Sequence, residues 1–260
     1  MKSFLKTYRK TLMFFAVVGL VGGFFTGLFT LETYPAELRQ QLLAELETAG
    51  MGDFPADLLM AVITAGQAAG YGLVLGAIGI FLGKKTGLWK DQRAIEKKPL
   101  VITLAISVIG GLSMILPDLL FFGQHSQVIL DSYAAKPSVP FILASVTYGA
   151  VIEEVMLRLF FMSAIAFVLH LIFGRKAPQP STEVLITANV ITAVLFGIGH
   201  LPATLMTIGS SPLIIFRCLA LNGGLGLLFG WLYRKHGLRY AMIAHGGCHI
   251  VSKLIWLLFI

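Results

Sequence analysis

Seven long apolar runs constrain the fold of this chain more than any other feature of its sequence. A membrane span needs about 20 consecutive apolar residues. Runs of roughly that length or longer cover residues 11–31, 58–83, 100–122, 139–173, 184–208, 212–233 and 238–260. Because backbone polar groups in lipid must be satisfied within their own segment, each run is expected to form a helix. The sequence therefore predicts an all-α, polytopic transmembrane helical bundle that forms a single membrane-embedded domain over residues 1–260. A break near Pro202 or Pro212 would add an eighth membrane segment to the seven.

The composition and the placement of charge support this class of protein. Only 13% of the residues are charged, whereas soluble domains carry about 25%. The net charge of +7 comes from short basic tracts beside the apolar runs, which is a topology signal and not a nucleic-acid site. The two cysteines, Cys218 and Cys248, lie within apolar runs and are interpreted as small core residues. We therefore expect the lipid bilayer as a partner and no nucleic acid.

Basic residues are concentrated in every second loop, which predicts the orientation of the chain. They are Lys2, Lys6, Arg9 and Lys10, then Lys84, Lys85, Lys90, Arg93, Lys97 and Lys98, then Arg175 and Lys176, and finally Arg234, Lys235 and Arg239. Cytoplasmic loops of membrane proteins are enriched in Lys and Arg. The alternation therefore places the N-terminus in the cytoplasm and, with seven spans, the C-terminus outside.

The first outer loop, residues 32–57, has a different pattern. Four leucines recur at helical spacing among acidic and basic residues; they are Leu38, Leu42, Leu43 and Leu46. This periodicity predicts a short amphipathic helix at the membrane interface. A connecting role is favoured for it over a gating role.

Two adjacent carboxylates lie inside the fourth run, in the stretch VIEEVMLRLFF. An ionisable side chain at the centre of a span costs about 2.5–3.5 kcal/mol on insertion scales, so it is a functional hypothesis by default. Glu154 and Arg158 are four residues apart and can pair on one face. Glu153 is rotated by about 100° from Glu154 and is expected to lack that partner. An unpaired, desolvated carboxylate has a raised proton affinity, which suits a general base.

Three histidines in other apolar runs complete a second pattern. His245 and His249 are four apart in the last run, and His200 lies in the fifth. Two imidazoles at that spacing can bind one metal ion. With His200 and Glu153 they would form a hydrolytic zinc site in which the glutamate is the base. The helices can bring these residues together only if runs four and five tilt or extend beyond the bilayer. Arg217 and Lys253 receive no assignment, and His125 and His170 are interpreted as structural.

These motifs together resemble those of one enzyme family. The pattern E-E-x-x-x-R is present as Glu153, Glu154 and Arg158, and F-x-x-x-H as Phe196 and His200, followed by a final histidine motif at His245. Their order and spacing over about residues 140–250 resemble the CPBP family of intramembrane proteases, which includes the CAAX prenyl endopeptidases and bacterial Abi proteins. The resemblance implies a protease core in this segment.

The resemblance also implies roles for the individual residues. In the family, water that hydrolyses a peptide bond is activated by the residues that correspond to Glu153 and His200, with Glu154 and Arg158 in support. The last family motif is commonly H-x-x-x-N, whose side chains stabilise the oxyanion. Here it is His245 followed by His249, so histidine replaces asparagine. An imidazole N–H can still donate to an oxyanion, and the change also favours metal binding. Zinc at Glu153, His200, His245 and His249 and a metal-free glutamate mechanism both stay open.

The implied function is an intramembrane endopeptidase that acts on a membrane protein or peptide, in the plasma (inner) membrane of a prokaryote. Two alternatives are compatible with the same buried residues. One is a non-catalytic immunity or partner-binding protein of the same fold. The other is a transporter or proton relay, which is less favoured because the sequence has no duplicated halves. The sequence indicates neither the substrate nor the oligomeric state.

Overall fold

The computed structural model of the protein describes residues 2–90, 94–174 and 177–260. Within these ranges all regular secondary structure is helical. Arg93, Arg175 and Lys176, which contribute to the predicted orientation, lie outside the described residues. The other basic tracts lie at helix ends, as a membrane protein requires.

Seven helices in the described residues are long and apolar enough to cross a membrane, and each contains most of one predicted run. Four are single helices at the two ends of the sequence: α1 (Lys2–Thr33), α3 (Ala56–Lys85), α10 (Pro212–His236) and α11 (Leu238–Phe259). A fifth is α9 (Thr182–Thr207). The third span joins α4 (Lys97–Pro117) to a π-helical turn η1 (Asp118–Phe122) and α5 (Gly123–His125). The fourth joins α7 (Val139–Ala144), η2 (Ser145–Glu153), η3 (Val155–Met162) and α8 (Ser163–Phe173). The all-helical transmembrane bundle is confirmed.

The two prolines that suggested an eighth segment have ordinary helical roles in the described residues. Pro202 lies inside α9, which continues past it to Thr207. Pro212 is the first residue of α10, where its missing N–H costs nothing. Ser211 caps that helix by accepting a hydrogen bond from the backbone N–H of Ile214. The span count is therefore seven among the described residues.

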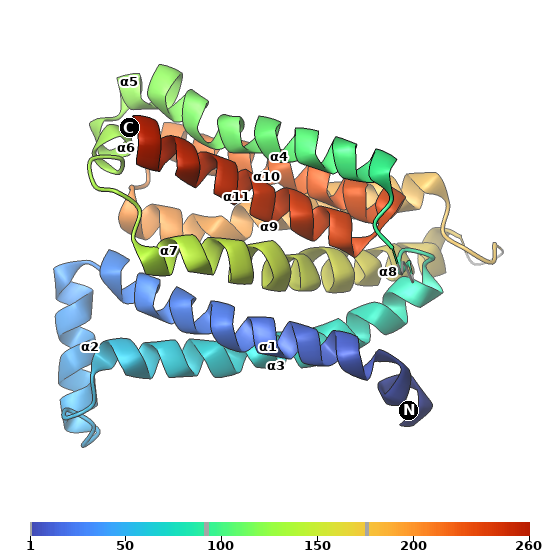
Figure 1. The fold of residues 1–260 in the computed structure, drawn as a ribbon, viewed down its shortest axis with the longest axis horizontal. Coiled ribbons are helices and arrows are strands. Elements are labelled where there is room, and N and C mark those ends of the chain that lie inside the picture. Colours follow the sequence, from blue (N-terminus) through green and yellow to red (C-terminus); the bar gives the residue numbers. More distant parts are fainter. Residues whose placement is uncertain (1, 91–93, 175–176) are drawn as a thin grey trace.

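Residues 32–57 contain the expected short helix, α2 (Ala36–Thr48). It lies across the ends of α1 and α3 that are far from the N-terminus (Figure 1). None of its residues is buried, so its leucines are only partly covered by the bundle. A second short helix, α6 (Gln127–Asp131), lies between the third and fourth spans.

The spans pack in neighbouring pairs, of which α1 with α3, α4 with α11, and α9 with α10 are the closest. Gly19 shows how close the first pair is, because a Cβ atom there would lie 2.6 Å from the carbonyl oxygen of Ala68. Small residues permit this approach in lipid, where packing replaces the hydrophobic effect. The fourth span lies between the α1–α3 pair and the C-terminal helices (Figure 1), so its side chains can contact both groups.

The middle of the fourth span is π-helical and not α-helical. The segments η2 and η3 follow one another, with Glu154 between them. A π-helix bonds residue i to i+5, and such turns are frequent at functional sites. This wide helix carries both glutamates of the E-E-x-x-x-R motif, and its buried side includes Ile152, Val155 and Leu159.

Candidate active site

Glu154 and Arg158 form a buried ion pair on the fourth span. Their side chains are 0% and 1% exposed, and Oε1 of the glutamate lies 3.1 Å from Nη1 of the arginine. Nη2 of Arg158 also donates to the carbonyl oxygen of Gly226 on α10, at 3.0 Å. The guanidinium carbon lies 4.5 Å from the centre of the Phe196 ring on α9. The pairing predicted from the sequence is confirmed, and it ties three spans together.

His245 on α11 binds the same carboxylate. Its Nδ1 lies 2.9 Å from Oε1 of Glu154, and because an ionised carboxylate only accepts, Nδ1 carries the proton. The imidazole stacks on Phe229, with the ring centres 4.7 Å apart and an angle of 18° between the planes. The neutral ring then presents its other nitrogen, Nε2, as an acceptor.

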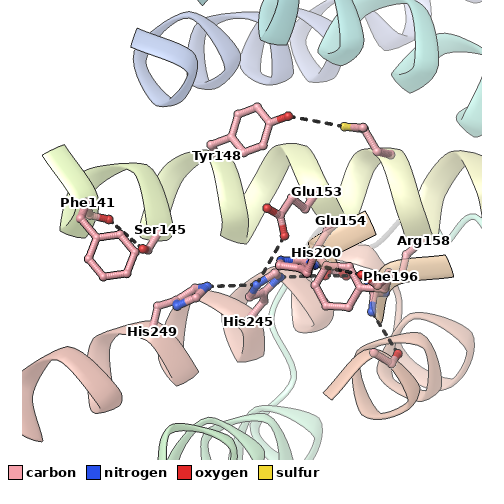
Figure 2. A network of polar contacts seen from close by, with 12 residues as sticks. Phe141, Ser145, Tyr148, Glu153, Glu154, Arg158, Phe196, His200, His245 and His249 are labelled. Carbon is pink, nitrogen blue, oxygen red and sulfur yellow. Dashed lines mark hydrogen bonds and ion pairs between the residues drawn. The ribbon is translucent and has the colours of Figure 1, made fainter. Parts of the chain in front are cut away.

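His249 and Lys253 extend this network along α11. Nε2 of His249 lies 3.2 Å from Nε2 of His245, and Nζ of Lys253 lies 3.3 Å from Nδ1 of His249. An ammonium group only donates, so Nδ1 of His249 accepts and its Nε2 donates to His245. The hydrogen bonds thus run in one direction, from Lys253 through both histidines to Glu154 (Figure 2 shows the two imidazoles and both glutamates).

Glu153 has a different environment from its neighbour. Its side chain is 22% exposed, and its Oε2 lies 3.9 Å from Nε2 of His245. Within the described residues no Lys or Arg forms an ion pair with it, as the sequence predicted from its rotation. Figure 2 shows its carboxylate pointing from the fourth span toward His245. Of the two adjacent carboxylates, Glu154 is therefore buried and paired, whereas Glu153 is partly accessible.

His200 reaches the same cluster from α9. Its Nδ1 lies 2.8 Å from the carbonyl oxygen of Phe196, so Nδ1 donates and the neutral ring keeps Nε2 as an acceptor. The Phe196 ring contacts both His200 and His245, with ring centres 4.7 and 5.8 Å apart. The phenylalanine of the F-x-x-x-H motif thus positions two imidazoles and the guanidinium of Arg158.

Comparison with known proteins gives one match. Residues 135–251 match the family model described as type II CAAX prenyl endopeptidase Rce1-like. Over this segment, the chain is similar to the CAAX prenyl endopeptidase family. No curated protein and no solved structure matched the chain. The family and the seven apolar helices together make this an integral multi-pass membrane protein.

The matched segment contains every site residue predicted from the sequence: Glu153, Glu154, Arg158, Phe196, His200, His245 and His249. The structure brings all of them into one cluster built from the fourth span, α9 and α11 (Figure 2). Within the described residues, however, no group of three or more His, Cys, Asp or Glu is arranged to hold a metal ion. Zinc binding stays a prediction of the sequence, and the side-chain chemistry of the cluster is considered without it.

Sequence reasoning missed the roles of four polar residues. Lys253 lies two residues beyond the matched segment, yet it is 5% exposed and binds His249. Arg217 pairs with Asp118, which is fully buried at the start of η1. The hydroxyl of Tyr133 donates to the same carboxylate at 2.7 Å. The pair of Arg217 and Asp118 could have been sought from Arg217 itself, because a cation within an apolar run is expected to pair with a polar group of a neighbouring span.

Proposed function

We propose that this protein is an intramembrane endopeptidase, which hydrolyses a peptide bond of a membrane-associated protein or peptide with water activated by Glu153 and His200. One observation carries the proposal. The adjacent glutamates have opposite environments, since Glu154 is buried against Arg158 and His245 while Glu153 is accessible and has no guanidinium partner. Pairs of titratable groups in contrasting environments are the usual source of distinct acid and base roles.

The reaction begins with water bound beside Glu153 and His200. The carboxylate of Glu153 takes a proton from the water as its oxygen attacks the carbonyl carbon of the substrate. The carbonyl electron pair moves onto oxygen and forms a tetrahedral oxyanion. Collapse of that intermediate breaks the C–N bond, and the proton held by Glu153 goes to the departing amine. His200, which accepts at Nε2, orients the water and shares this proton.

The oxyanion requires an N–H donor near the attacked carbon. We assign this role to the Nε2–H group of His249, whose hydrogen bond shifts from Nε2 of His245 to the oxyanion when the substrate binds. Glu154 accepts the hydrogen bond from Nδ1 of His245 and holds that ring in place beside Glu153 and His249. Histidine at position 249 therefore serves where the family commonly has asparagine.

The orientation of the protein is part of the same proposal. The N-terminus of α1 and the basic C-terminal ends of α3 and α10 lie at one end of the bundle (Figure 1). With that end cytoplasmic, the protein would be placed in the plasma membrane of a prokaryote with its N-terminus inside.

The test is cleavage by purified protein in liposomes, with membrane-anchored peptides as substrates and mass spectrometry of the products. Glu153→Gln and His200→Ala are each expected to lose at least 100-fold in rate, since a general base contributes about 10²–10⁴-fold. Matched controls are Glu183→Gln in the first turn of α9 and His125→Ala in α5, both outside the cluster. Their rates should equal that of the unchanged protein.

Three outcomes would contradict the proposal. Cleavage retained in both active-site variants would exclude the assigned base. Solute flux across the liposomes without peptide cleavage would identify a transporter. A protective phenotype in cells that survives both substitutions would identify a non-catalytic immunity protein. Metal analysis of the same preparation decides the zinc question, because stoichiometric zinc that is lost in His245→Ala would place a metal in the site.

A further inference from the structure

A large groove lies on the opposite side of the catalytic helices from Glu153. It has a volume of about 1160 Å³ and is bordered by the first turns of α1, by α4, by η2 and by the first half of α11. Ala150 of η2 and Gly246 of α11 form part of its floor. A Cβ atom at Gly246 would lie 3.1 Å from the Cβ of Ala150, so these helices touch and separate the groove from the site.

The long walls of the groove are apolar. They include Phe14 of α1, Leu104 and Val108 of α4, and Ile243 and Ile250 of α11. Several of these side chains are about half exposed in the protein, and they face the space between α1 and α4. The volume exceeds the range of about 300–1,000 Å³ that is typical of small-ligand pockets. Its size and lining fit long hydrocarbon chains better than a compact polar molecule.

One end of the groove is cationic. Lys10 of α1, Lys90 in the connection between α3 and α4, and Arg239 in the first turn of α11 line it together. They come from the end of the bundle that also holds the N-terminus (Figure 1). Within the described residues none of the three forms an ion pair with a carboxylate. Trp89 and Tyr8 border the same end, as aromatic side chains do at the level of lipid headgroups.

Positive charge is concentrated around Lys90 at the cationic end of the groove. Its ammonium donates to the carbonyl oxygen of Lys235, which holds it among the basic residues that end α10. Burial, and then the neighbouring cations Lys235 and Arg234, lower the pKa of Lys90 below its ordinary value, and only Glu96 opposes them. A bound anion would relieve this repulsion.

We propose that the groove is a binding site for an anionic phospholipid, with the phosphate held by Lys10, Lys90 and Arg239 and the acyl chains along the apolar walls. The charge and the shape are both needed for this assignment. A free phosphate would leave the walls uncovered, and a neutral lipid would leave three cations without a counter-charge. The ligand contacts the reverse side of the two helices that carry Glu153 and His245. The site is separate from the proposed peptidase chemistry and is tested without it.

The experiment is native mass spectrometry of the full-length protein, released from vesicles that contain equal amounts of phosphatidylglycerol and phosphatidylcholine. We expect one phosphatidylglycerol to remain bound in preference to phosphatidylcholine. The triple variant with Lys10→Gln, Lys90→Gln and Arg239→Gln should lose at least tenfold in that preference. A control triple removes the same charge from exposed lysines outside the groove: Lys6→Gln, Lys97→Gln and Lys98→Gln. It should bind as the unchanged protein does.

A second pair of variants tests the apolar walls independently of charge. Leu104→Trp fills the groove and should reduce lipid retention, whereas Leu195→Trp, on α9 and outside the groove, should not. Equal retention of both lipids would overturn the proposal, as would equal losses in the two triple variants. Displacement of the lipid by an acidic peptide, but not by added phosphatidylglycerol, would assign the groove to a peptide instead. Melting curves of each variant show that the protein remains folded.

Discussion

The ion pair between Arg158 and Glu154 allows a quantitative prediction, because both side chains are fully buried. Arg158→Met keeps the length of the side chain and removes its charge. Glu154 then retains His245 as its partner but loses the guanidinium, and Gly226 loses its hydrogen bond from the side chain. Removing one member of a buried ion pair costs about 3–5 kcal/mol. We expect a loss of this size in the free energy of unfolding.

The two free cysteines provide the assay. Cys218 and Cys248 are 1% and 0% exposed, so a membrane-permeant fluorogenic maleimide reacts with them only when the bundle opens. When reclosing is faster than labelling, the labelling rate follows the open population. Since 1.4 kcal/mol is a factor of ten, Arg158→Met should accelerate labelling by roughly 100- to 4,000-fold.

Two comparisons separate this cost from a general effect of losing arginine. Arg39 and Asp57 form an exposed pair at 3.5 Å, and such pairs contribute about 0–1 kcal/mol. Arg39→Met should therefore change the labelling rate by less than about tenfold. Adding Glu154→Gln to Arg158→Met removes the uncompensated charge and should recover part of the loss. Labelling that is equally slow in Arg158→Met and the unchanged protein would refute the argument.

Two further predictions concern two other cations that lie within the spans, Lys253 and Arg217. Lys253→Met should lower kcat by about tenfold with little change in KM, because His249 loses the donor that fixes its tautomer. This effect of Lys253→Met should disappear when position 249 is already changed by His249→Asn. An equal loss of kcat in that background would show that Lys253 has a merely structural role. Asp118→Asn should lower the melting temperature, because Arg217, whose side chain is 17% exposed, loses its carboxylate partner; since the site is partly exposed, the cost should lie below the roughly 3–5 kcal/mol of a fully buried pair. The double variant with Arg217→Gln should be more stable than Asp118→Asn alone, as thermal unfolding in detergent would show.

The spans were predictable because the physics that defines them is local. Length and apolarity decide whether a segment crosses a bilayer, and all seven predicted runs became helices in the described residues. The ends shifted by a few residues, and α1 begins well before residue 11. The π-helical backbone of the fourth span could not be predicted in this way. The segment packs against α1, α3 and α11, and no periodicity within the segment encodes either these contacts or the wider helix.

The site was predictable as a set of residues but not as a network. The spacing of Glu154 and Arg158 is sufficient to predict their pairing within one helix. The contact of Glu153 with His245 joins two spans, and the sequence allowed the cluster to form only if the fourth and fifth runs tilt or extend beyond the bilayer. No sequence motif pointed to Lys253, because its partner His249 is the residue at which this chain departs from the family motif. Contacts between helices decide such roles, and a single sequence does not contain them directly.

The π-helical turns of the fourth span also allow the span to lose a residue without moving the glutamates that follow. In an α-helix, deleting one residue rotates everything beyond it by about 100°, which would carry Glu154 away from His245. In η2 the i to i+5 bonding holds surplus residues, so a deletion there is absorbed when a wide turn closes to α geometry. Chains of different length in this stretch can thus present the same two carboxylates. A gap opposite residues 145–152 in a comparison with other proteins is therefore no sign that the site has been lost.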